Sequence, residues 1–177
     1  TSGSILSPAA RCGLTGLRPT FGRISRYGVM ALSWTQDRLG PICRYAEDTA
    51  IVMQAIAKPD GRDMSVTDVP FNWNASFNIR ALKVGIIQES FDEIANATAK
   101  ANAEKMLATF KSLGVTQFIP ITVPNFTTAT GGFGPERTAY FDEHARAGRM
   151  KGTRGGTQSA GYLLPAPIYL QQQRARM

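Results

Sequence analysis

The strongest constraint on the fold lies in residues 81–123, where the apolar pattern predicts a strand, a helix and a second strand. Residues 81–89 alternate apolar and polar side chains, which is typical of a strand. The helix expected next ends at Gly114 and carries one apolar face, made of Ala103, Met106, Leu107, Phe110 and Leu113. Residues 115–124 predict the second strand. Because two strands joined through a helix normally lie parallel, we expect an α/β fold.

The segments on either side are richer in turns. Residues 1–41 contain many Gly and Pro residues, which predicts short strands joined by tight turns. From Ile42 to Ile56 the apolar residues recur at helical spacing. In the last third, glycine-bearing loops surround a short helix expected at Arg137–Ala147, and residues 167–177 predict a terminal helix.

Length and composition are those of one ordinary globular domain. The chain has 177 residues, of which 43% are hydrophobic. No apolar run approaches the roughly 18 residues of a membrane span, and the first residues lack the pattern of a signal peptide. We therefore expect a soluble, cytoplasmic protein with no membrane partner. The net charge of +7 is spread along the chain without interleaved aromatic residues, which favours solvated faces over a nucleic-acid surface.

Residues that could bind a metal or cofactor are sparse. Cys12 and Cys43 are too few for a disulfide framework and too isolated for a zinc site, which predicts two reduced thiols. His144 is the one histidine of the sequence, and on a charged helix it is more typical of an exposed side chain than of a base. The aspartates of residues 60–68 lack the spacing of a calcium loop. We expect neither a metal nor a cofactor.

A serine near the start stands in a setting suited to nucleophilic chemistry. Ser4 precedes a proline-started helix, where backbone N–H groups converge and can bind an oxyanion. Acyl transfer needs a nucleophile and such donors, and losing one donor costs on the order of 3 kcal/mol. Ser4 is a candidate nucleophile, with the amides of Thr1, Ser2 and Gly3 beside it. On pattern alone, a helix-capping serine in a turn is the more common alternative.

A series of short motifs resembles the second half of the amidase signature, over residues 1–57. In order, they are Gly3-Ser4-Ile5, Pro8-Ala9, Cys12-Gly13, Gly16-Leu17-Arg18-Pro19-Thr20, Gly22-Arg23-Ile24-Ser25-Arg26, Gly40-Pro41, and Arg44 with Asp48. Residues 138–149 and 163–177 are similar to stretches near the C-terminus of the same family, which includes bacterial amidases and the A subunit of the tRNA-dependent amidotransferase. Cys12 matches a family position and is expected to be buried.

The resemblance implies a fold in which helices sandwich a mixed β-sheet. Within one partial amidase domain, residues 81–123 would be a βαβ unit, and residues 124–177 would hold specificity loops and C-terminal helices. It also implies a hydrolase that cleaves a carboxamide C–N bond through a serine acyl-enzyme, with a relay of Ser, cis-Ser and Lys. Ser4 matches the nucleophile. The oxyanion hole is matched by the backbone amides of Thr1, Ser2, Gly3 and Ser4.

The match begins three residues before the nucleophile. In the family, the bridging serine and the lysine precede it, and no lysine of this sequence stands at the matching position. We therefore interpret the chain as the C-terminal portion of an amidase, truncated at the N-terminus, and expect it to be inactive by itself and marginally stable or prone to aggregate. Ser2 and Leu6 stand where the family commonly has Gly and Arg, which affects substrate choice more than chemistry.

Three functions are compatible with these motifs. The first is an amidase that acts on a small-molecule amide. The second is the glutamine-hydrolysing A subunit of a tRNA-dependent amidotransferase, which would need companion subunits and would meet nucleic acid only indirectly. The third is a non-catalytic amidase fragment. The sequence leaves open which amide is cleaved and whether the chain forms a homo-oligomer.

Overall fold

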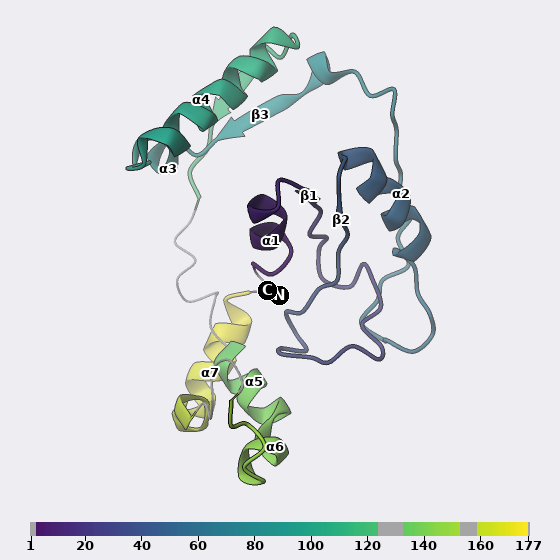
Figure 1. Ribbon diagram of the computed structural model, residues 1–177, viewed down its shortest axis with the longest axis vertical. Helices are drawn as coiled ribbons and strands as arrows, with labels where there is room; N and C mark the ends of the chain where they lie inside the picture. The colour runs from purple at the N-terminus through teal and green to yellow at the C-terminus, as the bar shows by residue number, and fades with distance from the viewer. Residues whose placement is uncertain (1–2, 124–132, 153–158, 177) are drawn as a thin grey trace. The chain divides into compact units, whose positions relative to one another are not determined.

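The computed structural model describes residues 3–123, 133–152 and 159–176. The chain divides into two compact units (Figure 1). Unit 1 combines Thr1–Trp73 with Phe126–Met177, and unit 2 is Asn74–Asn125. That all 177 residues form one domain stays a prediction.

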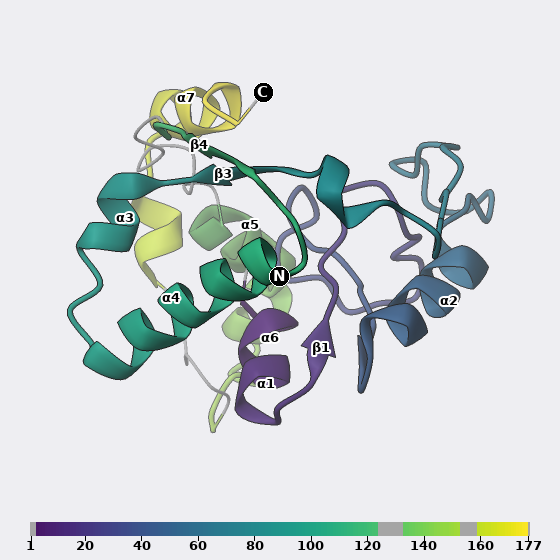
Figure 2. The ribbon, with the colours of Figure 1, turned by 90° about the horizontal axis from the view of Figure 1, so that it is seen from above.

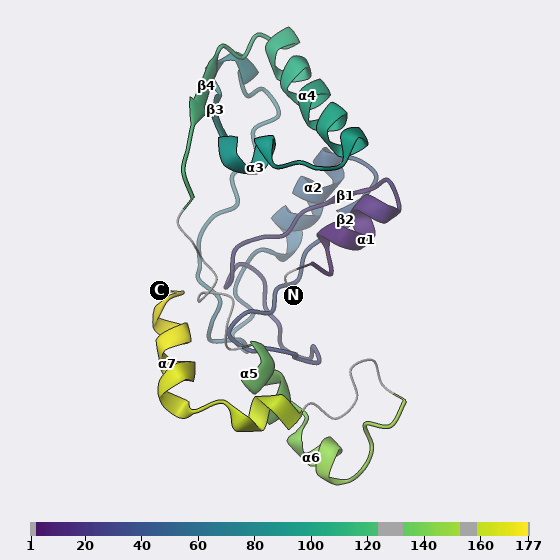
Figure 3. The ribbon, with the colours of Figure 1, turned by 90° about the vertical axis from the view of Figure 1, so that its left-hand side faces the viewer.

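Unit 2 contains the parallel strand pair that the sequence predicts. β3 (Lys83–Ile86) and β4 (Gln117–Pro120) pair in parallel, with Val84 opposite Phe118. The other elements of this unit are η1 (Ile79–Ala81), α3 (Gln88–Asp92) and α4 (Ala97–Ser112). Figure 3 shows β3 and β4 side by side. A helical crossover of this length lets the chain return in the same direction, which is the condition for parallel pairing.

Both ends of α4 carry local stop signals. The side chain of Asn96 accepts a hydrogen bond from the backbone N–H of Ala99 at 2.9 Å and so caps the first turn. Beyond the last turn, Gly114 has a φ of +91°, a conformation that glycine adopts without a steric penalty. The helix therefore begins and ends where its own sequence directs.

The N-terminal part of unit 1 is a short antiparallel strand pair between two helices (Figure 2). Its elements are α1 (Leu6–Arg11), β1 (Thr15–Gly16), β2 (Ile42–Cys43) and α2 (Ala46–Ile56). The sequence periodicity predicts a helix from Ile42, but α2 begins only at Ala46. Ile42 and Cys43 pair with β1 instead, and the carboxylate of Asp48 accepts a hydrogen bond from the Tyr45 N–H at 3.3 Å at the start of α2.

The core of unit 1 joins α2 to the turns of residues 17–40. Ile24, Met53 and Ala57 are buried together, and Leu17, Leu39 and Phe71 pack against them. Gly40 is part of the same close packing, because a Cβ at this position would lie 2.2 Å from the carbonyl oxygen of Leu17. Only glycine lets the two backbone segments approach this closely.

The C-terminal part of unit 1 is helical. Its elements are α5 (Phe133–Tyr140), α6 (Asp142–Arg146), η2 (Ser159–Leu163) and α7 (Ala166–Arg174), and Figure 3 labels its three α-helices. The expected helix at Arg137–Ala147 is thus two helices, because Phe141 between them adopts φ −98° and ψ 10°. The terminal helix predicted for residues 167–177 is confirmed as α7.

The expected burial of Cys12 is wrong. α1 directs Ala9 into the core, whereas Cys12 follows the last residue of the helix and is exposed. Among the helices of the described residues, none is long and apolar enough to cross a membrane. Several large apolar side chains of unit 1 are exposed, among them Met30, Met64, Leu163 and Leu170. The marginal stability expected for the chain stays a prediction.

Candidate functional site

Ser4 lies in the turn that leads into α1, and it is exposed. The carbonyl oxygen of Gly3 accepts a hydrogen bond from the N–H of Ser7 at 2.8 Å, which closes this turn. The next residue, Ile5, is buried and anchors the turn to the core. The turn thus holds Ser4 at the surface. Thr1 and Ser2, the other expected members of the oxyanion hole, lie outside the described residues.

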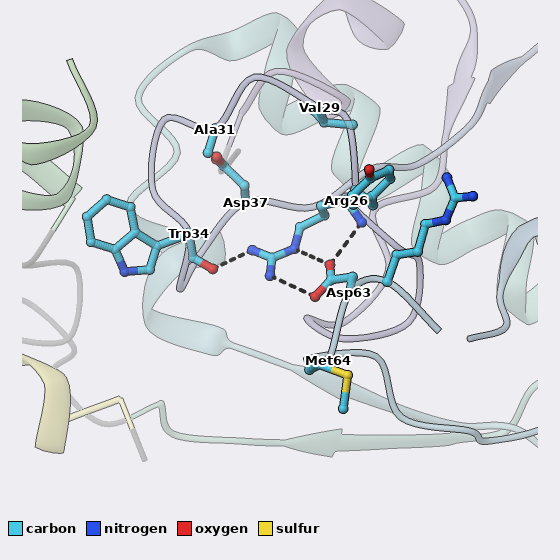
Figure 4. Close-up of a pocket in the computed structure, with 9 residues that line it drawn as sticks. Arg26, Val29, Ala31, Trp34, Asp37, Asp63 and Met64 are labelled. Carbon is cyan, nitrogen blue, oxygen red and sulfur yellow. Dashed lines mark hydrogen bonds and ion pairs between the residues drawn. The ribbon is translucent and has the colours of Figure 1, made fainter. Parts of the chain in front are cut away.

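A cavity of about 240 Å³ opens in unit 1 between the turns of residues 26–37 and the loop of residues 62–64 (Figure 4). Its walls combine aromatic and aliphatic groups with charged ones. The lining residues are Arg26, Tyr27, Val29, Ala31, Trp34, Asp37, Arg62, Asp63 and Met64. An apolar hollow with a few polar groups is the usual form of a small-molecule site.

An ion pair between Arg26 and Asp63 connects the two sides of this cavity (Figure 4). Arg26 Nε lies 3.1 Å from Asp63 Oδ2, and the backbone N–H of Arg26 donates to the same oxygen at 2.9 Å. Arg26 Nη1 also donates to the carbonyl oxygen of Trp34, and Nη2 donates to Ser65 Oγ at 2.8 Å. Every nitrogen of the Arg26 guanidinium thus donates a hydrogen bond. Through these bonds Arg26 connects the turn that contains Trp34 to the loop that contains Asp63 and Ser65.

The pair is largely shielded from water. The side chains of Arg26 and Asp63 are 17% and 11% exposed. The Ser65 hydroxyl, followed by the Arg26 hydrogen bonds, holds the pKa of Asp63 well below its usual range, against the opposing effect of burial. Asp63 is therefore ionised at neutral pH.

A second buried carboxylate, Glu136 of α5, lies at the centre of a hydrogen-bond cluster in unit 1. It is 1% exposed. From residues 33–35 it accepts hydrogen bonds from Ser33 Oγ at 2.5 Å, Thr35 Oγ1 at 2.5 Å and the Thr35 N–H at 3.1 Å. From α7 it accepts hydrogen bonds from Tyr169 at 3.2 Å and Gln173 at 3.1 Å.

This cluster stabilises the charged form of Glu136. Burial by itself raises the pKa of the carboxyl group, but the hydrogen bonds from Ser33, Thr35 and Tyr169 outweigh it and hold the pKa below its ordinary value. Arg176 Nη2 lies 3.7 Å from the carboxylate and partly balances its charge. The sequence carries no signal for this role, because Glu136 stands in a polar stretch far from its partners in the chain.

The charged residues of α6 (Asp142–Arg146) form contacts near the surface, and His144 is exposed as expected. His144 is exposed, and its Nδ1 accepts a hydrogen bond from Arg149 Nε at 2.9 Å. Glu143 pairs with the same arginine at 2.7 Å, and Asp142 pairs with Arg146 at 2.8 Å. Exposed pairs of this kind contribute little to stability.

Asp60 and Asp63 accept hydrogen bonds from donors of the protein itself. Asp60 accepts hydrogen bonds from Ser25 Oγ at 2.6 Å and from the Arg62 N–H at 2.9 Å. Within the part of the chain that the structure describes, no group of three His, Cys, Asp or Glu residues is placed to hold a metal ion. The hydrogen bonds of Asp60 and Asp63 connect their loop to Ser25 and Arg26.

The sequence comparison decides the family. The family model described as Amidase matches residues 1–162. The chain belongs to the amidase family. A relative in Synechococcus sp. (strain RCC307), named as the A subunit of glutamyl-tRNA(Gln) amidotransferase, is 40% identical over 129 residues, which are 71% of this chain and 26% of the relative. The protein of the same name in Geobacter metallireducens is 33% identical over 164 residues, or 91% of this chain and 33% of the relative.

Solved structures of amidase-family proteins share the fold. A crystal structure of the A subunit of glutamyl-tRNA(Gln) amidotransferase from Thermotoga maritima matches with a TM-score of 0.74 and 24% identity, over 99% of this chain and 41% of that one. The native peptide amidase of Stenotrophomonas maltophilia matches with a TM-score of 0.69 and 23% identity, over 97% of this chain and 42% of that one. The predicted α/β fold class of the amidase signature is thereby confirmed.

The chain covers only part of these proteins. It spans 26% and 33% of the length of the two curated relatives. The activity, substrates and partners of a whole amidase are therefore proposals for this chain.

Proposed function

We propose that this amidase-family chain carries the nucleophile of an amide hydrolase, and that Ser4 is that nucleophile. The observation that carries the proposal is the position of Ser4, which is exposed in a closed turn directly before α1. The Amidase family model, which matches residues 1–162, supports the same assignment. From the resemblance to the amidase signature, we propose that the backbone amides of residues 1–4 form the oxyanion hole.

The proposed reaction is acyl transfer to serine and then to water. Ser4 Oγ forms a bond with the carbonyl carbon of a carboxamide while its proton passes to the bridging serine and lysine of the family relay. The carbonyl electron pair moves to oxygen, where the backbone N–H groups stabilise the negative charge. When this intermediate collapses, the C–N bond breaks and the nitrogen leaves as ammonia or an amine with the relayed proton. Water then cleaves the ester and frees Ser4.

A narrower proposal is that the chain belongs to a glutamine-hydrolysing subunit of a tRNA-dependent amidotransferase. The names of the curated relatives favour it, because both are called the A subunit of glutamyl-tRNA(Gln) amidotransferase. In that case the released ammonia would pass to an acyl group on tRNA, and companion subunits would be needed. Co-purification of such subunits separates this proposal from an amidase that acts alone.

The test is labelling with a fluorophosphonate, which reacts with activated serines. The chain is prepared both as it stands and extended by the sequence that its source gene encodes upstream. Ser4→Ala is the test variant, and Ser7→Ala is the matched control, because Ser7 is also exposed and lies in α1. Labelling of the extended protein that Ser4→Ala abolishes and Ser7→Ala preserves supports the proposal. A folded extended protein that is not labelled overturns it and favours the non-catalytic alternative.

A further inference from the structure

The turn of residues 33–37, called here the 33–37 segment, contacts two different parts of unit 1. Some of its residues line the cavity, and others bind a buried carboxylate. Trp34 and Asp37 line the cavity of Figure 4. Ser33 and Thr35 instead donate hydrogen bonds to the buried carboxylate of Glu136. One short turn thus forms part of a cavity wall and also contacts a helix more than a hundred positions later in the chain.

The internal hydrogen bonds of the 33–37 segment define its shape but not its position. The N–H groups of Gln36 and Asp37 donate to the carbonyl oxygen of Ser33, at 3.0 and 2.8 Å. The Asp37 carboxylate accepts the N–H groups of Leu32 and Ser33, at 2.6 and 2.9 Å. All of these contacts lie within residues 32–37. Position must come from contacts to the rest of unit 1.

Three charged groups supply contacts of that kind, and one of them is Arg176, whose Nη2 donates to Thr35 Oγ1 at 2.9 Å. On the cavity side, Arg26 donates to the carbonyl oxygen of Trp34. On the other side, Glu136 accepts three hydrogen bonds from Ser33 and Thr35. Hydrogen bonds to a buried charge are stronger than those between neutral groups. The same carboxylate accepts donors from Tyr169 and Gln173, so it connects the 33–37 segment to α7 as well as to α5.

We propose that Glu136 is a positioning residue for the cavity, and that it acts by holding the 33–37 segment so that Trp34 stands in the cavity wall. Glu136 is not itself among the residues that line the cavity. Its effect on a ligand would therefore pass through Trp34 and Asp37. The proposal concerns the shape of the cavity and does not depend on the role of Ser4, so the two can fail separately.

The experiment uses the full chain with Trp73→Phe, which leaves Trp34 as the one tryptophan of the two in the sequence. Glu136→Gln keeps the shape of the side chain but removes its charge and one acceptor. Trp34 emission and acrylamide quenching are measured at a temperature where far-UV circular dichroism shows the variant folded. We expect Trp34 emission at longer wavelength and stronger quenching than in the parent. The reason is that the 33–37 segment would shift, so that Trp34 leaves the cavity wall and becomes more exposed to water.

Two variants separate positioning from general stability. Glu143→Gln is the matched control, since Glu143 is 87% exposed and pairs only at the surface with Arg149; it should leave Trp34 unchanged. Ser33→Ala should shift Trp34 in the same direction as Glu136→Gln, and the double variant should shift it no further than Glu136→Gln alone.

Two results would contradict the proposal that Glu136 positions the 33–37 segment. If Glu136→Gln lowers the melting temperature but leaves the emission and quenching of Trp34 as in the parent, Glu136 is a stabilising residue only and the proposal is wrong. If Glu136→Gln does not fold, Thr35→Val replaces it. This variant removes the hydroxyl that donates to Glu136 and accepts from Arg176, and it keeps the Thr35 N–H bond to Glu136. An unchanged Trp34 in folded Thr35→Val and Ser33→Ala variants would also overturn the proposal.

Discussion

Arg26 and Asp63 form a double contact at the wall of the cavity, with Arg26 Nε and the Arg26 backbone N–H both directed at Asp63 Oδ2, at 3.1 and 2.9 Å. The pair joins the motif-bearing turns of residues 22–26 to a loop that belongs to no recognised motif. The signature-like motif therefore depends on a partner outside itself.

Asp63→Asn should lower the free energy of unfolding by about 1.5–3 kcal/mol, since it weakens hydrogen bonds to a charged group that is mostly shielded from water. Urea unfolding followed by circular dichroism measures this. Asp68→Asn is the control, because Asp68 is exposed in the same loop and should change stability little. Equal effects of the two substitutions would show that the ion pair contributes nothing specific.

The stability of the chain should fall in acid partly through Glu136. The folded-state pKa of this carboxyl is lowered, so its contribution is fully present above the pKa of an unfolded glutamate, about 4.3, and is lost as the pH falls through the folded value. Unfolding free energies measured across this range should decline less steeply in Glu136→Gln than in the parent. Parallel curves would contradict the lowered pKa.

Gly40→Ala should destabilise unit 1 by about 1–3 kcal/mol through overpacking. The added methyl group would lie 2.2 Å from the carbonyl oxygen of Leu17 and 2.9 Å from Pro19 Cδ. Thermal unfolding is the measurement. Gly134→Ala is the control, since a Cβ there meets nothing within 4 Å, and it should not reduce the melting temperature.

Asn96→Ala should cost about 1 kcal/mol in unit 2, because the first turn of α4 loses the acceptor of the Ala99 N–H. Asn102→Ala, at an exposed position in the middle of the same helix, should instead be neutral or slightly stabilising. Circular dichroism and thermal unfolding of the two variants give the comparison. A loss of stability in both would mean that the cap is not the cause.

Ser4→Ala should reduce amide hydrolysis by the extended protein on the order of a thousandfold or more, as expected when a nucleophile is removed. Ammonia release from a panel of carboxamides, glutamine included, measures it. Ser7→Ala should retain the parent rate. Unchanged hydrolysis in Ser4→Ala would assign the chemistry to another residue.

The sequence predicted those features that depend on neighbours in the chain. The strand and helix periods of residues 81–123 led to the parallel pairing of β3 and β4, and Gly114 marked the end of α4. The motifs around Ser4 led to the amidase family, which the family model confirms. These features can be predicted because apolar periodicity, turn residues and short motifs each involve residues only a few positions apart in the sequence.

Tertiary structure decided the contacts between distant segments. α2 begins at Ala46 and not at Ile42, because the residues before it pair with β1. Glu136 becomes a buried anion because folding brings Ser33, 103 positions away, within 2.5 Å of it. Such a role has no periodic or motif signal. A carboxylate in a polar stretch is stable in water, and only the donors that surround it after folding make its burial favourable.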